Sequence, residues 1–263
     1  MLVFLKLGGS LITDKTHPYT PRPEKLDDLA AQIAAAMQDH PDMQLILGHG
    51  SGSFGHQAAS CFGTRNGVAS MEAWRGFAEV WYQASALNRI VVESLHHAGL
   101  PVITLSPAAS ITAHEGKVSI WDLYPLTTAL NQGLLPVIHG DVAFDDERGG
   151  TILSTEDLFA HLARKLHPNL ILLAGLEAGV WEDFPSRTNL VKELTPQNSG
   201  KLLPNLGRSA SMDVTGGMQT KVNEMLALVE EVPGLEVLIF SGEEPGNIRQ
   251  ALLGNTPGTI IHR

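Results

Sequence analysis

Short apolar runs of strand length recur along this 263-residue chain, and longer amphipathic stretches separate them. A strand inside a parallel sheet is covered by helices on both faces, so its sequence is apolar throughout rather than alternating. Runs of this kind occupy residues 2–7, 45–47, 102–105, 135–138, 170–174 and 237–240. The sequence therefore predicts a mostly parallel central sheet.

The stretches between these runs carry apolar residues at helical spacing. These residues are Leu26, Leu29, Ile33 and Met37; Val80, Leu87, Val91 and Leu95; Leu158 and Leu162; and Val222, Leu226 and Val229. Strands that alternate with helices indicate crossover units, hence an α/β sandwich with helices on both faces of the sheet. We expect a single domain over residues 1–263 with two lobes, and loops or a hairpin over residues 182–212.

Composition limits the partners that such a chain can have. Its 18 basic and 28 acidic side chains give a formal net charge of −10, which argues against nucleic acid or an anionic membrane as a partner. The single Cys61 excludes an intrachain disulfide framework and a multi-cysteine metal site. No run approaches the roughly 18 apolar residues of a membrane span, and the N-terminus lacks a signal-peptide pattern. We expect a cytoplasmic protein.

A glycine pair and two lysines mark the end of the first expected strand. Lys6 lies inside the apolar run, and Gly8, Gly9, Ser10 and Lys15 follow it. Glycines in this place let backbone amides approach a phosphate closely. The position of Lys6 inside an apolar run also indicates a charged partner, because lysine is rarely buried without one. The pattern predicts a phosphate site, and a tight turn with two solvated lysines is the alternative.

A second glycine-rich loop follows the second expected strand, where residues 50–56 read Gly-Ser-Gly-Ser-Phe-Gly-His. The match to G-x-G-x-x-G opens a dinucleotide-binding alternative, but that fingerprint requires a second strand ending in an acidic residue about 20 residues further on. Glu72 lies near that distance, within an expected helix. We therefore favour anion binding, with His56 projecting toward the ligand, whereas His49 is equally consistent with a packed, hydrogen-bonded residue.

Residues 213–221 contain a third glycine turn, with Gly217 at the start of an expected helix and Lys221 one turn later. Such a helix start suits a phosphate group, although a capped helix with a surface lysine has the same pattern. Thr155 and Asp157 lie at another expected helix start, where an N-cap with acidic first-turn residues is the simplest interpretation. Because ligands bind at the carboxyl ends of such strands, the three glycine turns together predict one phosphate-binding cleft. The absence of a G-x-x-x-x-G-K-[ST] motif excludes a P-loop enzyme.

The segments 6–10, 13–15, 50–56 and 213–218 together resemble the amino acid kinase superfamily, and within it the isopentenyl phosphate kinases. The resemblance covers almost the whole chain and keeps the order of the family's motifs. It implies an open αβα sandwich, a homodimer, and phosphorylation of isopentenyl phosphate, an isoprenoid monophosphate, by ATP with Mg²⁺. It also implies an acceptor-side lobe at about residues 1–165 and a nucleotide-side lobe at about residues 166–263.

The resemblance also implies roles for single residues. The residues that would bind ATP are Lys6, Gly8, Gly9, Ser10, Gly52, Gly175, Gly217 and Lys221. Those that would bind the acceptor are Ser51, Gly55, His56 and Thr155. Lys6, Lys15 and His56 would act in catalysis, with Lys15 reaching the transferred group. Asp157 would be the family acid that orients the lysines.

The chain departs from the family pattern at two places. Ser51 replaces a glycine of His-Gly-Gly-Gly-Ser-Phe-Gly-His, and residues 175–180 read Gly-Leu-Glu-Ala-Gly-Val where the family has Thr-Asp-Val-Asp-Gly-Val. The second departure leaves the contacts to the nucleotide base, and the nucleotide preference, open.

A phosphate acceptor suits this set of residues. A phosphate monoester has its second pKa at about 6, so much of it is a dianionic nucleophile at neutral pH and needs no general base. The site must instead cancel charge between two anions, which Lys6, Lys15 and His56 can do. An apolar pocket would hold the hydrocarbon tail, although core packing is the other interpretation of the candidates. These are Trp74, Phe77, Val80 and Trp81.

Two alternatives stay open from the sequence. One is another small-molecule kinase of the same fold, such as a fosfomycin-type kinase, whose acceptor is also a phosphonate-like anion. The other is a nucleotide- or oxyanion-binding protein without turnover.

Overall fold

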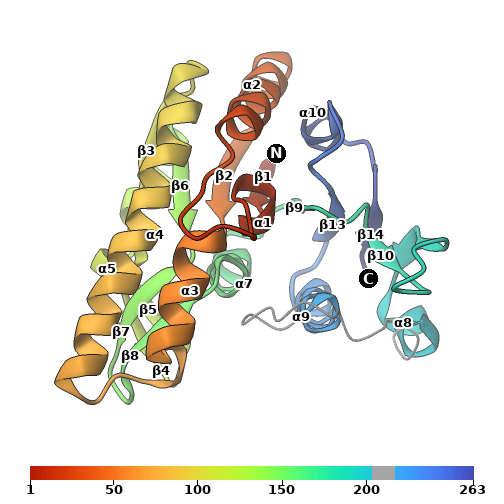
Figure 1. The fold of residues 1–263 in the computed structure, drawn as a ribbon. Coiled ribbons are helices and arrows are strands. Elements are labelled where there is room, and N and C mark those ends of the chain that lie inside the picture. Colours follow the sequence, from red (N-terminus) through yellow and green to blue (C-terminus); the bar gives the residue numbers. More distant parts are fainter. Residues whose placement is uncertain (203–216) are drawn as a thin grey trace.

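An eight-stranded sheet forms the centre of the molecule (Figure 1). The structure, a computed structural model, describes residues 1–202 and 217–263, without the side chains of residues 56–58, 60 and 61. The strand order is β12-β14-β13-β9-β1-β2-β6-β3, and among these strands only β13 and β14 pair antiparallel. The strands are β1 (Leu2–Leu7), β2 (Gln44–His49), β3 (Val102–Thr104), β6 (Leu135–His139), β9 (Leu170–Gly175), β12 (Glu193–Leu194), β13 (Glu236–Ser241) and β14 (Thr259–Ile261). The predicted parallel sheet is confirmed, and each of the six apolar runs forms one of its strands.

Two smaller sheets accompany the central one. The strands β4 (Ile111–His114), β5 (Lys117–Trp121), β7 (Asp141–Asp145) and β8 (Gly149–Leu153) form a four-stranded sheet in the order β5-β4-β7-β8. The sequence carries no clear signal for this sheet, because its strands are short and partly exposed and lack the continuous apolar runs of the central sheet. β10 (Val180–Trp181) and β11 (Leu190–Val191) form a hairpin, of which β11 lies in the segment 182–212 where loops or a hairpin were expected and β10 lies directly before it. Residues 203–212 of that segment lie outside the described part.

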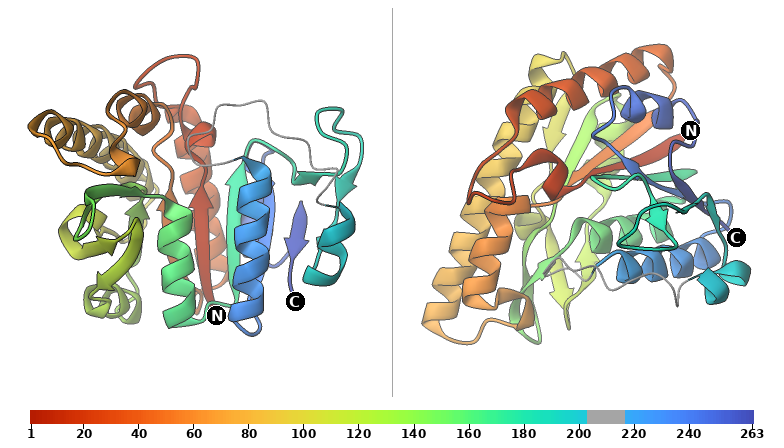
Figure 2. Two further views of the ribbon diagram at one scale, coloured as in Figure 1. Left: turned by 90° about the horizontal axis from the view of Figure 1, so that it is seen from below. Right: turned by 45° about the vertical axis from the view of Figure 1, so that its right-hand side comes forward.

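Helices cover both faces of the central sheet (Figure 2). α2 (Pro23–Asp39), α10 (Asn247–Leu252) and the C-terminal half of α4 (Met71–His97) pack on one face, and α7 (Thr155–Leu166) and α9 (Met218–Glu231) pack on the other. The remaining helices are α1 (Gly9–Ile12), α3 (Gly52–Phe62), the short 3₁₀ helix η1 (Thr64–Asn66), α5 (Pro107–Ser110), α6 (Tyr124–Asn131) and α8 (Pro196–Leu202). Across residues 1–202 and 217–263, no helix has the length and apolarity needed to cross a membrane.

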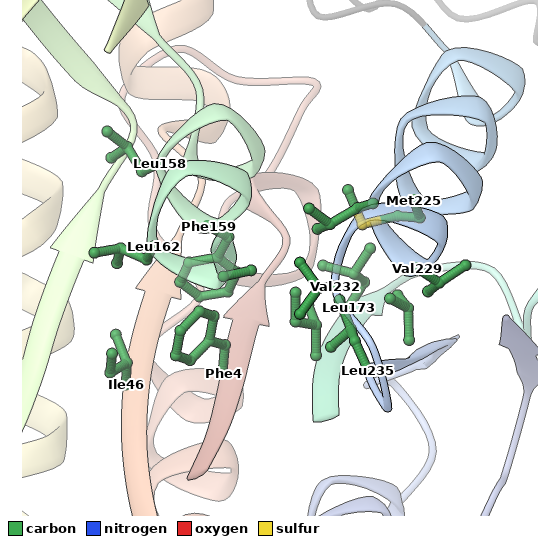
Figure 3. Close-up of a cluster of buried hydrophobic side chains, with 14 of the residues drawn as sticks. Phe4, Ile46, Leu158, Phe159, Leu162, Leu173, Met225, Val229, Val232 and Leu235 are labelled. Carbon is green, nitrogen blue, oxygen red and sulfur yellow. The ribbon is translucent and has the colours of Figure 1, made fainter. Parts of the chain in front are cut away.

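The alternation of side chains along β1 decides where Lys6 points. Val3 and Leu5 belong to the apolar cluster under α2, whereas Phe4 belongs to the cluster under α7 and α9. Because side chains two residues apart share a face of a strand, Lys6 lies on the α7 and α9 face with Phe4. Phe4 packs against Phe159 of α7 with ring centroids 5.1 Å apart, as Figure 3 shows. This contact fixes the first turn of α7 above the end of β1.

Truncation of this aromatic contact tests how far the site depends on the core. Phe159→Ala should lower the free energy of unfolding by about 3–5 kcal/mol, because Phe159 is only 1% exposed and its loss leaves a cavity. Urea unfolding followed by circular dichroism measures the change. Met71→Ala, at the start of α4 and 76% exposed, is the control and should change it by less than about 0.5 kcal/mol. Equal losses in the two variants would contradict the packing described.

Candidate active site

A cavity of about 1010 Å³ opens at the carboxyl ends of β1, β2 and β9. This is the edge at which open α/β sheets bind their ligands. Fourteen residues were expected above to act in catalysis, in ATP binding or in acceptor binding. Twelve of them line the cavity, namely Lys6, Gly8, Gly9, Ser10, Lys15, Ser51, Gly52, Gly55, Thr155, Gly175, Gly217 and Lys221. His56 belongs to α3, but its side chain lies outside the described part, as do residues 213–216 of the third glycine turn. Asp157 does not line the cavity.

Two lysines meet one carboxylate at the base of the cavity. The ammonium group of Lys6, which is 9% exposed, donates a hydrogen bond to Oε1 of Glu156. Nζ of Lys221, in the first turn of α9, lies 3.6 Å from the same oxygen. Glu156 lies in the first turn of α7 and is 8% exposed. A strand and the starts of two helices thus converge on a group of two cations and one anion, of which Lys6 and Glu156 are buried.

The electrostatics of this group favour an ionised Glu156. Burial alone would raise the pKa of its carboxyl, but the charges of Lys6 and Lys221 and the hydrogen bond from Lys6 lower the pKa to about 2. Among the described residues of this group, two positive charges face one negative charge, which favours the approach of a phosphate.

The acid between the lysines is Glu156, and the expectation that Asp157 would take this place is corrected. Asp157 is the third residue of α7, and its Oδ2 accepts hydrogen bonds from the backbone N–H and the hydroxyl of Ser154, at 2.8 and 2.7 Å. The Ser154 side chain in turn accepts a hydrogen bond from the Asp157 backbone, which completes a capping box. Adjacent helical residues point about 100° apart, so the capping geometry of Asp157 directs Glu156 toward the lysines.

The two glycine loops that follow β1 and β2 lie directly against each other. A Cβ atom on Gly9 would lie 2.4 Å from the backbone nitrogen of Gly52. Gly52 adopts φ +49°, and a Cβ atom there would lie 2.6 Å from the Gly9 carbonyl oxygen. Only glycine at both positions permits this backbone contact. Two anions held by these loops would therefore be neighbours.

Residues 1–241 match the model of the amino acid kinase family. The chain belongs to this family. The isopentenyl phosphate kinase of Methanocaldococcus jannaschii is 33% identical over 269 residues, which cover 99% of this chain and 98% of the relative. The isopentenyl phosphate kinase of Arabidopsis thaliana is 27% identical, over 98% of this chain and 94% of the relative.

Solved structures show the same similarity. A structure described as isopentenyl phosphate kinase matches with a TM-score of 0.83 and 31% identity, over 99% of this chain and 100% of the other. An N-acetylglutamate synthase from Neisseria gonorrhoeae matches with a TM-score of 0.71 but only 18% identity, which shows the shared fold alone.

In this member of the amino acid kinase family, one section of the cavity wall is apolar. It is lined by Ala59, Gly63, Val80, Ala84, Ile152 and Leu153. Of the four α4 residues proposed for a tail pocket, only Val80 lines the cavity. Phe77 packs behind Val80 in the same buried cluster without lining the cavity, and Trp74 and Trp81 are partly exposed. Helical spacing explains the correction, because it places Ala84 beside Val80 and turns the tryptophans away.

His49 is a packed residue. Its ring stacks on His139 with centroids 5.3 Å apart, and its Nε2 lies 3.1 Å from Oδ1 of Asn88. Burial, with the neighbouring His139, lowers the pKa of His49 to about 4, so the ring is neutral near pH 7. It therefore contributes no cation to the cavity.

Further residues of the cavity wall were not among those expected from the sequence. Arg65, in η1, places Nη2 3.8 Å from Oδ2 of Asp157, while its Nη1 is buried without a hydrogen-bond partner in the described part of the chain. Its position in a polar Gly-Thr-Arg-Asn-Gly turn resembles an ordinary solvated loop, so no pattern identified it. Asp141 is buried and also lines the cavity, at the Gly-Asp turn that the sequence does show.

The segment after β9 forms a polar section of the cavity wall. Trp181 Nε1 donates to Oε2 of Glu177 at 2.9 Å, and Arg187 Nη2 donates to Oε1 at 2.7 Å. All three residues line the cavity. Both oxygens of this carboxylate are thus already engaged by the protein.

The pH dependence of stability tests the lysine–carboxylate group. A carboxyl whose folded pKa is about 2 instead of 4.5 stabilises the fold above pH 4.5 and loses that contribution as the pH falls toward 2. Between pH 6 and pH 3, the free energy of unfolding of wild type should therefore fall by roughly 2 kcal/mol more than that of Glu156→Gln, as measured by urea unfolding. Glu79→Gln, on the exposed surface of α4, is the control that should follow wild type. Parallel curves for wild type and Glu156→Gln would contradict the assignment.

Proposed function

We propose that this protein is an ATP-dependent kinase that converts isopentenyl phosphate to isopentenyl diphosphate by direct transfer between two phosphate groups. The observation that carries the proposal is the placement of Lys6, Lys15 and Lys221 around one cavity that continues into an apolar section. Cations suit two phosphorylated molecules, and the apolar section suits a short hydrocarbon tail. Near full-length similarity to isopentenyl phosphate kinases supports this choice over other acceptors.

The cavity chemistry fits a reaction that needs no general base. The acceptor phosphate is itself an anionic nucleophile at neutral pH, so catalysis depends on bringing two anions together and stabilising the charge of the transition state. Lys6 and Lys221, oriented by Glu156, hold the ATP phosphates. Lys15 contacts the transferred group from the loop after α1. His49, which is neutral and buried, takes no part.

The remaining residues are assigned as binding groups. Gly8, Gly9, Ser10, Gly52, Gly175 and Gly217 contact ATP through the backbone, and Ser51, Gly55, His56 and Thr155 hold the acceptor phosphate. The acceptor then lies in the lobe of about residues 1–165 and the nucleotide in the lobe of about residues 166–263. β1 pairs with β2 on one side and β9 on the other, which supports a reaction centre at the boundary of the lobes.

A Mg²⁺ ion fits this site as part of the nucleotide. Within the described residues no three His, Cys, Asp or Glu side chains gather as a metal site, and Glu156 is engaged by two lysines. Mg²⁺ commonly keeps several waters and binds through substrate phosphates, so it would enter with ATP and neutralise phosphate charge. Asp141 is the other buried carboxylate of the described cavity wall, and it could approach the ion there.

The proposal includes a cytoplasmic homodimer. Several large apolar side chains are exposed on α4, β3, β5 and α6, which supports a partner surface on that side of the molecule. They are Trp81, Tyr82, Ile103, Ile120 and Tyr124.

Release of ADP with different acceptors tests the function. The purified protein should consume ATP with isopentenyl phosphate, and EDTA should abolish turnover. His56→Ala should lose acceptor binding and turnover while ATP binding survives. Turnover with a fosfomycin-type phosphonate but not with isopentenyl phosphate would overturn the substrate assignment. ATP binding without turnover on any acceptor would instead favour a sensing or storage protein.

Charge removal at the base of the cavity tests the role given to Glu156. Glu156→Gln keeps the size of the side chain but leaves Lys6 and Lys221 to repel each other, so kcat should fall about 10- to 100-fold. Asp157→Asn disturbs the helix cap and the contact with Arg65 but leaves Glu156 between the lysines. It should lower kcat less than about threefold, with a stability loss of about 1 kcal/mol. Steady-state kinetics on both variants decides between the two acids. The reverse ranking would restore Asp157 as the orienting residue.

A further inference from the structure

Thr13 connects the two glycine loops and the segment that carries Lys15. It is the residue that ends α1, it is 1% exposed, and it stands between the Gly8-Gly9 turn and Lys15. The function proposed above gives it no task. Its position in the sequence is that of an ordinary loop threonine.

The hydroxyl of Thr13 joins one loop to the other. It donates to the carbonyl oxygen of Gly9 at 2.7 Å and accepts the backbone N–H of Ser53 at 3.0 Å. Gly9 belongs to the loop after β1, and Ser53 belongs to the first turn of α3, which follows β2. A hydroxyl has one donor and two acceptor sites, so this side chain can satisfy both loops at once.

The backbone of Gly52 lies directly against this hydroxyl. A Cβ atom on Gly52 would lie only 2.1 Å from Oγ1 of Thr13. Because Gly9 and Gly52 are also in backbone contact, no side chain separates the loops. Their spacing therefore depends on backbone contacts, which include a hydrogen bond from Gly50 N–H to the Leu7 carbonyl at 3.0 Å, and on the bridging hydroxyl of Thr13.

The segment that carries Lys15 is fastened to the same helix start. The amide of Thr20 donates to Oγ of Ser53 at 3.3 Å, and the rings of Tyr19 and Phe54 lie edge to face with centroids 6.0 Å apart. Thr13 also pairs with Pro21 in an antiparallel bridge, which closes the base of the segment. A shift of α3 relative to Gly9 would therefore also move Lys15.

We propose that Thr13 is a positioning residue that sets the gap between the loop for the donor phosphates and the loop for the acceptor phosphate. This inference rests on the function proposed above. Reacting atoms must lie about 3–3.5 Å apart, and a misplacement of about 1 Å costs on the order of 100-fold in rate. The acceptor contacts of Ser51, Gly55 and His56 come from the loop after β2, and those of Gly8, Gly9 and Ser10 to ATP come from the loop after β1. Loss of the bridge leaves these contacts in place, so the separate affinities change little and the rate of transfer falls.

The test compares the near-isosteric Thr13→Val with the conservative Thr13→Ser. Thr13→Val should lower kcat about 10- to 100-fold and leave the KM of ATP and of isopentenyl phosphate within about threefold. A bisubstrate analogue, adenosine joined to isopentenol through a chain of phosphates, would span both loops. Calorimetry should show that it binds Thr13→Val about tenfold more weakly than wild type. Thr13→Ser keeps the hydroxyl and should restore both values to within about threefold of wild type.

Thr259→Val is the matched control. Thr259 is fully buried, and its hydroxyl likewise accepts one backbone N–H, of Val180 at 2.8 Å, and donates to one carbonyl, of Val191 at 2.5 Å. It joins the β10–β11 hairpin to β14 and not the two phosphate loops. Loss of the Thr259 hydroxyl should lower the melting temperature at least as much as Thr13→Val does, while kcat stays within about threefold of wild type.

The outcomes separate this inference from the proposed function. Wild-type turnover decides the function, and the variants are then compared on the acceptor that wild type uses. A Thr13→Val enzyme with unchanged kcat, or a Thr13→Ser enzyme as slow as Thr13→Val, would overturn the positioning role while the kinase assignment stands. Equal weakening of ATP and of the bisubstrate analogue would likewise reduce Thr13 to a structural residue. A wild-type protein that transfers phosphate to no acceptor would end both proposals.

Discussion

The contact of Lys6 and Lys221 with Glu156 is the interaction on which the site depends. Two ammonium groups at the end of a buried strand repel each other and lose hydration, so they come together only around a carboxylate. The carboxylate must in turn arrive from a helix start, which α7 supplies because Phe159 packs on Phe4. The core under α7 and α9 therefore positions the charge at the top of the sheet.

The absence of side chains between the phosphate loops is the second constraint. Gly9 and Gly52 bring two backbones into contact, and Gly52 adopts a left-handed conformation that favours glycine. The loops of β1 and β2 can be this close because the two strands are paired neighbours in the sheet. Transfer between two phosphates needs this proximity more than it needs an acid or a base. The cations then offset the repulsion that the proximity creates.

The two ends of the cavity differ in character. On one side small residues such as Ala59 and Ala84 leave an apolar section, and the bulky aromatic residues of α4 face elsewhere. On the other side Glu177 is held by Trp181 and Arg187 in a polar section. The lysines and the glycine loops thus occupy the middle of the cavity, between an apolar and a polar end.

The sequence by itself determined the parallel sheet and the edge at which ligands would bind. Apolar runs buried on both faces have a local signature, and glycine turns after strands mark the carboxyl edge without any tertiary information. Only the tertiary structure decided that Glu156 and not Asp157 meets the lysines, because two adjacent acids in a first turn look alike until the capping box with Ser154 fixes one of them. It also decided the four-stranded sheet, the place of Arg65 and the bridge made by Thr13, since each depends on contacts between segments far apart in the chain.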